Sequence, residues 1–159
     1  MTNHDNVDIL LVEDNPNDAE LLLMAFRKHS LPYKVAVVRD GAEAIDFIFC
    51  TGAYATRHPF TPKLILLDLK LPLVSGLEVL ARIKSDQEKK LIPVVVFSSS
   101  AEEQDILKSY QAGANSYIQK PVDYDTYTRT VTTIVSFWLQ RNLLPLSVSH
   151  FHYNQNKAI

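Results

Sequence analysis

Several polar side chains suited to metal binding or phosphoryl chemistry stand directly after short apolar segments of the chain. They are Glu13, Asp14, Asp68, Ser98 and Lys120. Asp68 follows residues 64–67, a wholly apolar run typical of a strand buried on both faces. A carboxylate at the end of such a strand can be a metal ligand, a nucleophile or a general base. Its chemistry therefore depends on which groups the fold brings beside it.

Alternating strand and helix patterns predict the fold that positions these side chains. Strands are predicted at residues 7–12, 33–38, 64–67, 93–97 and 116–119. Helices are predicted after the cap residue Asn15, at residues 42–49, 76–85 and 101–112, and from Asp123 to about Asn142. This alternation indicates an α/β protein with a flavodoxin-like (βα)5 fold, a doubly wound parallel sheet with strand order 2-1-3-4-5.

The predicted strand order gathers the polar side chains at one edge of the sheet. The first and third strands flank the point where the order reverses, and open α/β sheets bind ligands beyond the carboxyl ends of the strands there. Three carboxylates packed together repel one another unless a cation lies among them. Oxygen ligands combined with water favour Mg²⁺. A divalent ion beside Asp68 would make a site for a phosphoryl group, whose charge the metal and Lys120 would share.

Length, charge and cysteine content narrow the class of protein. The 159 residues suggest one domain, which we place at residues 7–142, between an N-terminal extension, 1–6, and a C-terminal tail, 143–159. The net charge of −2 gives no argument for nucleic acid or a membrane surface, so neither is expected as a partner. The N-terminus lacks a secretory signal pattern, and the single Cys50 allows no internal disulfide. We therefore expect a cytoplasmic protein.

Four segments together resemble the response-regulator receiver domain over residues 7–142. They are LLVED, LILLDLKLP with Gly76 eight residues past Asp68, PVVVFSS and AGANSYIQKP. The resemblance implies that Asp68 accepts a phosphoryl group from a sensor histidine kinase. It also implies that Asp14, Asp68 and the backbone carbonyl of Lys70 bind Mg²⁺ directly. Glu13 would act through a metal-bound water.

The same resemblance assigns three further side chains and one peptide bond. Lys120 would pair with the phosphoryl oxygens, Ser98 would donate a hydrogen bond to them, and Tyr117 would turn inward on activation. The peptide bond before Pro121 would be cis. From the residues alone, Ser98 could equally be a helix cap, Ser100 is interpreted as one, and Tyr117 could be ordinary strand surface.

A narrower resemblance is to the small response regulators that partner cyanobacterial phytochromes. It rests on the opening LLVEDNPNDAELL, the turn at Asp40 and Gly41, the long loop 51–63 and the ending SFWLQ…LP. It implies a phytochrome-type kinase as partner and no output domain after the receiver. Exposed apolar positions Ile106, Tyr110 and Phe137 suggest an interface, and the resemblance implies a homodimer through the helix 101–112, the strand 116–119 and the last helix. The alternative is that they are scattered surface residues.

Two other functions compete with phosphorylation-controlled signalling. An aspartyl-phosphate phosphohydrolase of the haloacid-dehalogenase kind would need a second acid two residues after its nucleophile, where this chain has Lys70. A receiver-like scaffold that takes no phosphate would not need the set Asp14, Asp68, Ser98 and Lys120. We therefore expect no enzyme beyond catalysis of its own phosphoryl transfer and dephosphorylation. Lys70 beside the path of the hydrolytic water predicts slow self-dephosphorylation.

Overall fold

The computed structural model describes residues 6–145 and contains one parallel sheet with the strand order β2-β1-β3-β4-β5. Its strands are β1 (Ile9–Val12), β2 (Val35–Val38), β3 (Leu64–Leu67), β4 (Val94–Ser98) and β5 (Ser116–Gln119). The helices are α1 (Pro16–Lys28), α2 (Gly41–Phe49), α3 (Gly76–Ser85), α4 (Glu103–Gln111) and α5 (Tyr124–Val135). Short 3₁₀ turns lie at η1 (Gly52–Tyr54) and η2 (Lys89–Leu91), and a π-helical segment, η3 (Ser136–Arg141), continues α5. The predicted flavodoxin-like fold is confirmed.

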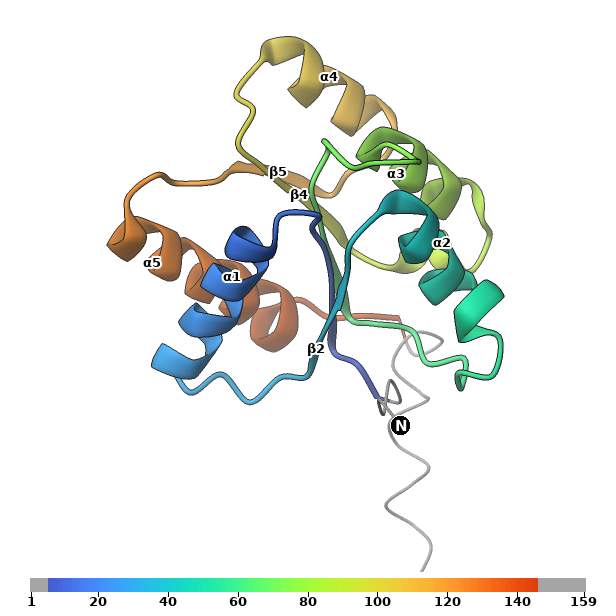
Figure 1. Ribbon diagram of the computed structural model, residues 1–159, viewed down its shortest axis with the longest axis horizontal. Coiled ribbons are helices and arrows are strands. Elements are labelled where there is room, and N and C mark those ends of the chain that lie inside the picture. Colours follow the sequence, from blue (N-terminus) through green and yellow to red (C-terminus); the bar gives the residue numbers. More distant parts are fainter. Residues whose placement is uncertain (1–5, 146–159) are drawn as a thin grey trace, which may run out of the picture.

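Helices cover both faces of the sheet. Figure 1 shows α1 and α5 on one side and α2, α3 and α4 on the other. Alternate residues of β3 face these two layers: Leu64 and Leu66 pack in the core under α1 and α5, whereas Ile65 and Leu67 pack under α2 and α3. Burial on both faces explains why this strand is a continuous apolar run.

The helices that follow β1, β2 and β3 begin at side-chain caps near the carboxyl edge of the sheet. Asn15 accepts hydrogen bonds from the backbone N–H groups of the first turn of α1, and Asp40 accepts one from Glu43 N at the start of α2. Ser75 and Glu78 form a reciprocal capping box at the start of α3. These caps fix the chain directions around the strand ends that carry the acidic residues.

Gly76 allows α3 to begin directly against the end of β3. A Cβ atom at this position would lie 2.2 Å from the backbone oxygen of Asp68 and 2.6 Å from Cα of Leu69. Both neighbours are backbone atoms, so no side-chain movement could relieve the contact. The close approach therefore requires glycine and fixes the backbone on which Asp68 stands.

Some element boundaries differ from the sequence predictions. The first two strands begin two residues later than predicted, at Ile9 and Val35. The helix predicted at 101–112 is shorter, and the prediction that Ser100 caps it is wrong, because Glu102 occupies the cap position. Ser100 Oγ instead donates to Asp105 Oδ2 at 2.6 Å and accepts from Glu102 N, which holds the preceding loop. None of the helices between residues 6 and 145 has both the length and the apolar composition needed to cross a bilayer.

Candidate phosphoacceptor and metal site

Backbone hydrogen bonds that extend the strand pairing hold the predicted site residues at the carboxyl edge of the sheet. Glu13 N donates to Val38 O at 3.0 Å, and Asp68 N donates to Val12 O at 3.1 Å. Lys120 N donates to the carbonyl of Ser98 at 2.7 Å. The side chains of Glu13, Asp68 and Lys120 therefore leave rigid strand ends rather than free loops.

The ammonium group of Lys120 lies at the centre of the site. Its Nζ is 2.5 Å from Glu13 Oε2, 3.0 Å from Asp18 Oδ2 and 3.2 Å from Asp68 Oδ2. The Lys120 side chain is 8% exposed, that of Glu13 is more deeply buried, and that of Asp68 is nearly as buried. An ammonium has three N–H groups, so each one has a carboxylate partner. The structure thus brings Glu13, Asp68 and Lys120 together as predicted.

Three carboxylates of the site are close enough to hold a divalent metal ion. Oxygen atoms of Glu13, Asp14 and Asp68 all lie within 4.8 Å of one another. Ligands on opposite sides of Mg²⁺ are about 4.2 Å apart, since each bond is roughly 2.1 Å long. Small rotations of these side chains would therefore fit them to such an ion. The donor set contains only oxygen, which suits a hard cation.

Burial and the neighbouring charges set the protonation of the two most enclosed groups. Burial raises the pKa of the Glu13 carboxyl to about 7, in spite of its hydrogen bond to Lys120. Burial alone would lower the pKa of Lys120, but the carboxylates of Glu13, Asp68 and Asp18 outweigh it, so this pKa lies above its ordinary value. Lys120 is therefore a permanent positive charge beside Asp68. Glu13 Oε1 also accepts from Asn15 N, so both of its oxygens have partners.

Ser98 and Tyr117 form hydrogen bonds that link the site to the loop between β4 and α4. Ser98 is fully buried, and its Oγ accepts a hydrogen bond from Ser100 N at 3.2 Å, which leaves its hydroxyl hydrogen free to donate. The half-buried Tyr117 donates its hydroxyl to the carbonyl of Ser100 at 2.9 Å. Tyr117 N in turn donates to the hydroxyl of Tyr110 in α4, at 3.2 Å. These bonds join the end of β4 to β5 and α4.

The sequence also led to predictions about Lys70 and about the peptide bond before Pro121. Lys70 is exposed, two residues after Asp68, and its effect on dephosphorylation stays a prediction. The expectation of a cis peptide bond before Pro121 is wrong, because residues 6–145 contain no cis peptide bond.

The predicted interface residues lie on two elements, α4 and η3. Ile106 is half-buried in α4, and Tyr110, also in α4, is 50% exposed. Phe137 in η3 is 51% exposed and lies edge-on to Trp138, with ring centroids 4.9 Å apart. Ile106 and Tyr110 therefore share one helix, whereas Phe137 lies on the segment that continues α5.

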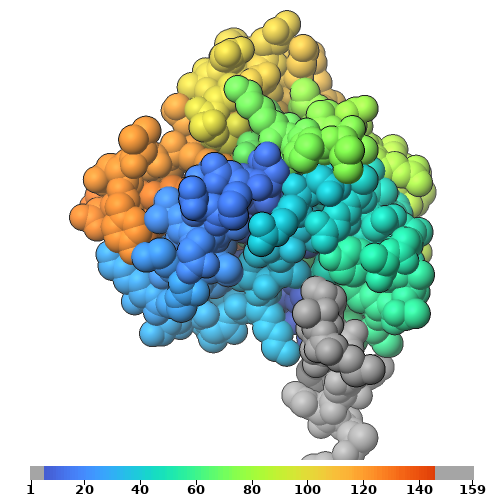
Figure 2. Space-filling model, in the orientation of Figure 1, coloured from blue at the N-terminus to red at the C-terminus, as the bar shows by residue number. Residues whose placement is uncertain are grey.

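Asp18 is a site residue that the sequence reasoning missed. An acid in the first turn of a helix ordinarily serves to favour the positive end of the helix dipole, yet the Asp18 carboxylate also contacts Lys120 directly. Figure 2 shows the start of α1, in dark blue, beside the orange part of the chain that begins after β5. Asp18 could have been predicted from its place in the first turn of the helix after β1. This helix starts at the sheet edge where Asp68 lies.

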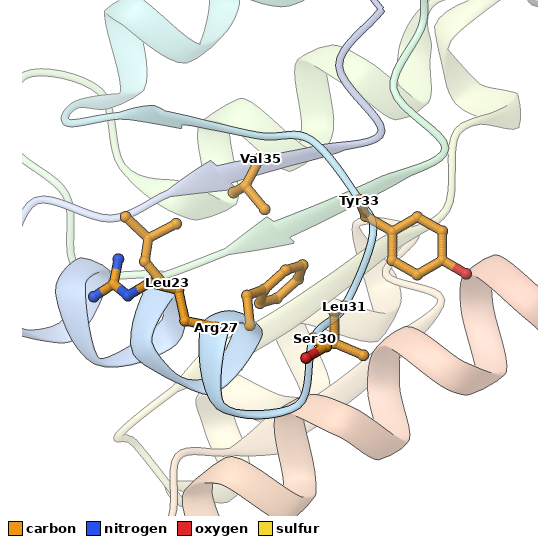
Figure 3. Close-up of a pocket in the computed structure, with 7 residues that line it drawn as sticks. Leu23, Arg27, Ser30, Leu31, Tyr33 and Val35 are labelled. Carbon is orange, nitrogen blue, oxygen red and sulfur yellow. The ribbon is translucent and has the colours of Figure 1, made fainter.

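A shallow pocket lies at the opposite edge of the sheet. Figure 3 shows it between the end of α1 and the beginning of β2. Its lining residues are Leu23, Phe26, Arg27, Ser30, Leu31, Tyr33 and Val35. None of these side chains is acidic, so this pocket lacks the ligands that the carboxyl edge offers to a cation.

Comparison with known proteins identifies the family. The model of the response regulator receiver domain matches residues 9–132. The chain is 39% identical over 137 residues to response regulator Rcp1 of Synechocystis sp., covering 86% of this chain and 92% of that protein. It is 37% identical over 137 residues to the probable methanogenesis regulatory protein FilR2 of Methanothrix harundinacea, covering 86% of each chain.

Solved structures agree with these sequence matches. The phosphorylated cyanobacterial phytochrome response regulator RcpA has a TM-score of 0.80 and 45% identity, covering 86% of this chain and 96% of that chain. The Mn²⁺-bound form of Rcp1 has a TM-score of 0.79 and 39% identity, covering 86% of this chain and 97% of that chain. Receiver domains bind a divalent metal ion, and the acidic cluster lies where this chain would hold one. The chain belongs to the response regulator receiver family, whose members signal by phosphorylation, and it resembles the phytochrome response regulators within that family.

Proposed function

We propose that Asp68 accepts a phosphoryl group from a sensor histidine kinase, with Mg²⁺ as the metal. The observation that carries this proposal is the position of the Asp68 carboxylate. One of its oxygens is 3.2 Å from the ammonium of Lys120, and the same carboxylate belongs to the acidic cluster with Glu13 and Asp14. A carboxylate so placed has a fixed cation on one side and a metal site on the other, which is what a transferring phosphoryl group needs.

The proposed transfer needs no proton from this protein. The Asp68 carboxylate oxygen forms a bond to phosphorus as the bond from phosphorus to the donor imidazole nitrogen breaks. The imidazole leaves as a neutral ring when its other nitrogen already carries a proton. Hydrolysis later removes the phosphoryl group. Water attacks phosphorus, the acyl–phosphate bond breaks, the Asp68 carboxylate is restored and inorganic phosphate is released. The protein contributes alignment and charge neutralisation rather than a strong nucleophile.

Individual residues have separate roles in this proposal. The N–H of Lys120 that now faces Asp68 would donate to a phosphoryl oxygen, and the free hydroxyl hydrogen of Ser98 would donate to another.

Asp14, Asp68 and the Lys70 carbonyl would hold Mg²⁺, with Glu13 acting through water, and the bound ion would neutralise phosphoryl charge. Both oxygens of Glu13 already have partners, which supports an indirect role. Tyr117 would carry the change outward through its bond to Ser100.

We infer that the kinase is of the phytochrome type. The similarity to RcpA, a cyanobacterial phytochrome response regulator, supports this assignment.

We also propose a cytoplasmic protein that catalyses only its own phosphoryl transfer and dephosphorylation, with residues 7–142 as the receiver unit. For the output we propose a homodimer through α4, β5 and α5. The half-exposed rings of Tyr110 and Phe137 support an apolar interface there, and Ile106 would lie at its edge.

Transfer from a phosphorylated kinase tests this function. The labelled phosphoryl group should move from the kinase to the wild-type chain only with Mg²⁺ present, and it should be released by hydroxylamine, as an acyl phosphate is. Asp68→Asn removes the nucleophile and should receive no label. Label on Asp68→Asn would exclude this residue as the acceptor, and absence of transfer to the wild type would favour a scaffold that takes no phosphate. Turnover of small phosphomonoesters would instead indicate a phosphohydrolase.

A further inference from the structure

Asp18 contacts the site from outside the set of acceptor and metal residues. Its Oδ2 is 3.0 Å from Lys120 Nζ, and its side chain is 38% exposed, far more than that of Lys120. It comes from the first turn of α1, whereas the other partners of Lys120 come from the ends of β1 and β3. Asp18 therefore covers the ammonium on its solvent side.

Two of the three N–H groups of Lys120 point to carboxylates that would not react. Glu13 takes one and Asp18 takes another, and the third faces Asp68 Oδ2. The N–H directions of an ammonium are tetrahedral, so fixing two of them fixes the third. A lysine on its flexible four-carbon chain has no such orientation of its own. The direction of the N–H toward Asp68 is thus determined by the pair of carboxylates behind it.

Asn15 ties these two carboxylates to each other. Its backbone N–H donates to Glu13 Oε1 at 3.1 Å, and its side-chain Oδ1 accepts from the backbone N–H of Asp18 at 3.4 Å and of Asn17 at 2.9 Å. The helix cap that starts α1 therefore also sets the spacing of the two groups that hold Lys120. Pro16 at the first helical positions stiffens the same turn.

We propose that Asp18 is a positioning residue, which orients Lys120 so that its third N–H meets the phosphoryl group that forms on Asp68. This inference rests on the proposed function, since it assigns a purpose to an orientation toward Asp68. When the phosphoryl group is present, Glu13 and Asp18 keep their two N–H groups, and only the third changes its acceptor. Asp18 lies outside the cluster of Glu13, Asp14 and Asp68, so it acts on the phosphoryl group through Lys120 and not through the metal.

A double-mutant cycle with beryllofluoride, which mimics the phosphoryl group on Asp68, tests this role. Calorimetry would give the Kd of Mg²⁺ alone and of beryllofluoride at saturating Mg²⁺ for the wild type, Asp18→Asn, Lys120→Met and the double variant. Asp18→Asn should weaken beryllofluoride binding by about tenfold, the usual effect of a lost charged hydrogen bond. It should change the Kd of Mg²⁺ much less, and it should have no weakening effect when Lys120→Met is present. Asp18→Glu should restore part of the affinity.

Glu20→Gln is the matched control, because it removes the same charge two residues further along α1, where Glu20 pairs with Arg27. It should bind beryllofluoride as the wild type does. If Asp18→Asn changed the affinity by the same factor with and without Lys120, Asp18 would act by its charge alone and the proposal would be wrong.

A second readout does not depend on ligand binding. The N–H signals of the Lys120 ammonium, assigned by their loss in Lys120→Met, should be protected from exchange in the wild type. Asp18→Asn should broaden them beyond detection. Sharp signals in Asp18→Asn would overturn the proposal, and this readout decides it if Lys120→Met binds no beryllofluoride. Absence of beryllofluoride binding by the wild type itself would contradict the proposed function, while the ammonium signals would still report on Asp18.

Discussion

At the scale of single residues, charge explains how the site is built. Three carboxylates, those of Glu13, Asp18 and Asp68, contact the ammonium of Lys120. A fourth, that of Asp14, lies in the metal cluster with Glu13 and Asp68. When all of them are ionised the site carries an excess of negative charge, which opposes an incoming phosphoryl group. A divalent cation removes most of this excess. This excess of negative charge therefore explains why the site should not accept a phosphoryl group without a metal ion.

Lys70 should prolong the life of the phosphoryl group. It is exposed and stands two residues after Asp68, where a long cation can pair with the site and shield the acyl phosphate. Replacement by asparagine, Lys70→Asn, should shorten the phosphoryl half-life by up to about fivefold, the effect expected of one exposed charge pair. The measurement is decay of the label on the isolated phosphorylated chain. Lys34→Asn, also at an exposed lysine, is the control, and an unchanged half-life in Lys70→Asn would refute the shielding role.

The sequence predicts most site residues because they stand at strand ends. Glu13 and Asp68 follow buried strands and Lys120 follows the partly buried β5, and a parallel sheet brings all such positions to one edge. Asp18 was missed because the direction of a helix side chain depends on how the helix packs. Ser100 was misinterpreted for a related reason, since its hydroxyl donates to Asp105 in the first turn of α4 while Glu102 occupies the cap position.

At the scale of secondary-structure elements, the start of α3 determines the position of Asp68. Gly76→Ala would force its methyl group against the backbone of Asp68 and Leu69. We expect a loss of about 1–3 kcal/mol in the free energy of unfolding, typical of overpacking, together with weaker Mg²⁺ binding. Denaturant unfolding and calorimetry measure the two effects.

Ser75→Ala is the control for Gly76→Ala. It removes the cap of the same helix, which should cost about 1 kcal/mol, but it places no atom against β3. Its affinity for Mg²⁺ should stay as in the wild type. If both variants weakened Mg²⁺ binding equally, the helix start as a whole would matter rather than the close contact at Gly76.

A half-buried lysine at the junction of α3, β4 and β5 should make stability depend on pH. Lys84 Nζ donates to the carbonyls of Lys90 and Ile92 and to Asn115 Oδ1, at 3.0, 2.8 and 2.9 Å. All three acceptors are neutral, and burial lowers the pKa of Lys84 to about 8. Between pH 8 and the ordinary lysine pKa of about 10.4, the unfolded chain binds more protons at this residue than the folded chain does. The contribution of Lys84 to stability should therefore rise with pH across this window.

The difference in unfolding free energy between the wild type and Lys84→Gln measures this contribution, because other titrating groups cancel. The free energy of unfolding of the wild type should increase relative to that of Lys84→Gln from about pH 8 upward. Asn115→Asp offers a matched variant, since it keeps the acceptor and adds a negative partner that raises the pKa of Lys84. A difference that stays flat from pH 7 to pH 10 would show that Lys84 is not destabilised by burial.

Element identity was easier to predict than element boundaries. Apolar runs identified β1, β3 and β4 because both faces of these strands are buried, and alternate residues of β3 indeed face opposite layers. Boundaries depend on local hydrogen bonds that sequence patterns do not show. The last helix is an example: α5 ends at Val135 and continues as the π-helical η3, although the sequence indicates one continuous helix.

At the scale of the whole molecule, the apolar surface at the end of α5 should control assembly. Phe137 is half-exposed and its ring lies against Trp138, which packs on the core under α1 and α5. Phe137→Glu would place a charge in the proposed interface and should weaken the dimer by at least about tenfold in Kd. Sedimentation velocity at micromolar concentration measures this. Leu73→Glu, at an exposed position in the connection to α3, is the control. A dimer unchanged by Phe137→Glu would place the interface elsewhere.

The most direct test of phosphorylation at Asp68 is a titration with beryllofluoride and Mg²⁺, followed by the fluorescence of Trp138, the single tryptophan. Sedimentation of the same samples would report whether the change reaches the dimer. We predict a saturable response that requires Mg²⁺ and is absent in Asp68→Asn. An equal response in Asp68→Asn, or no binding by the wild type, would contradict the account.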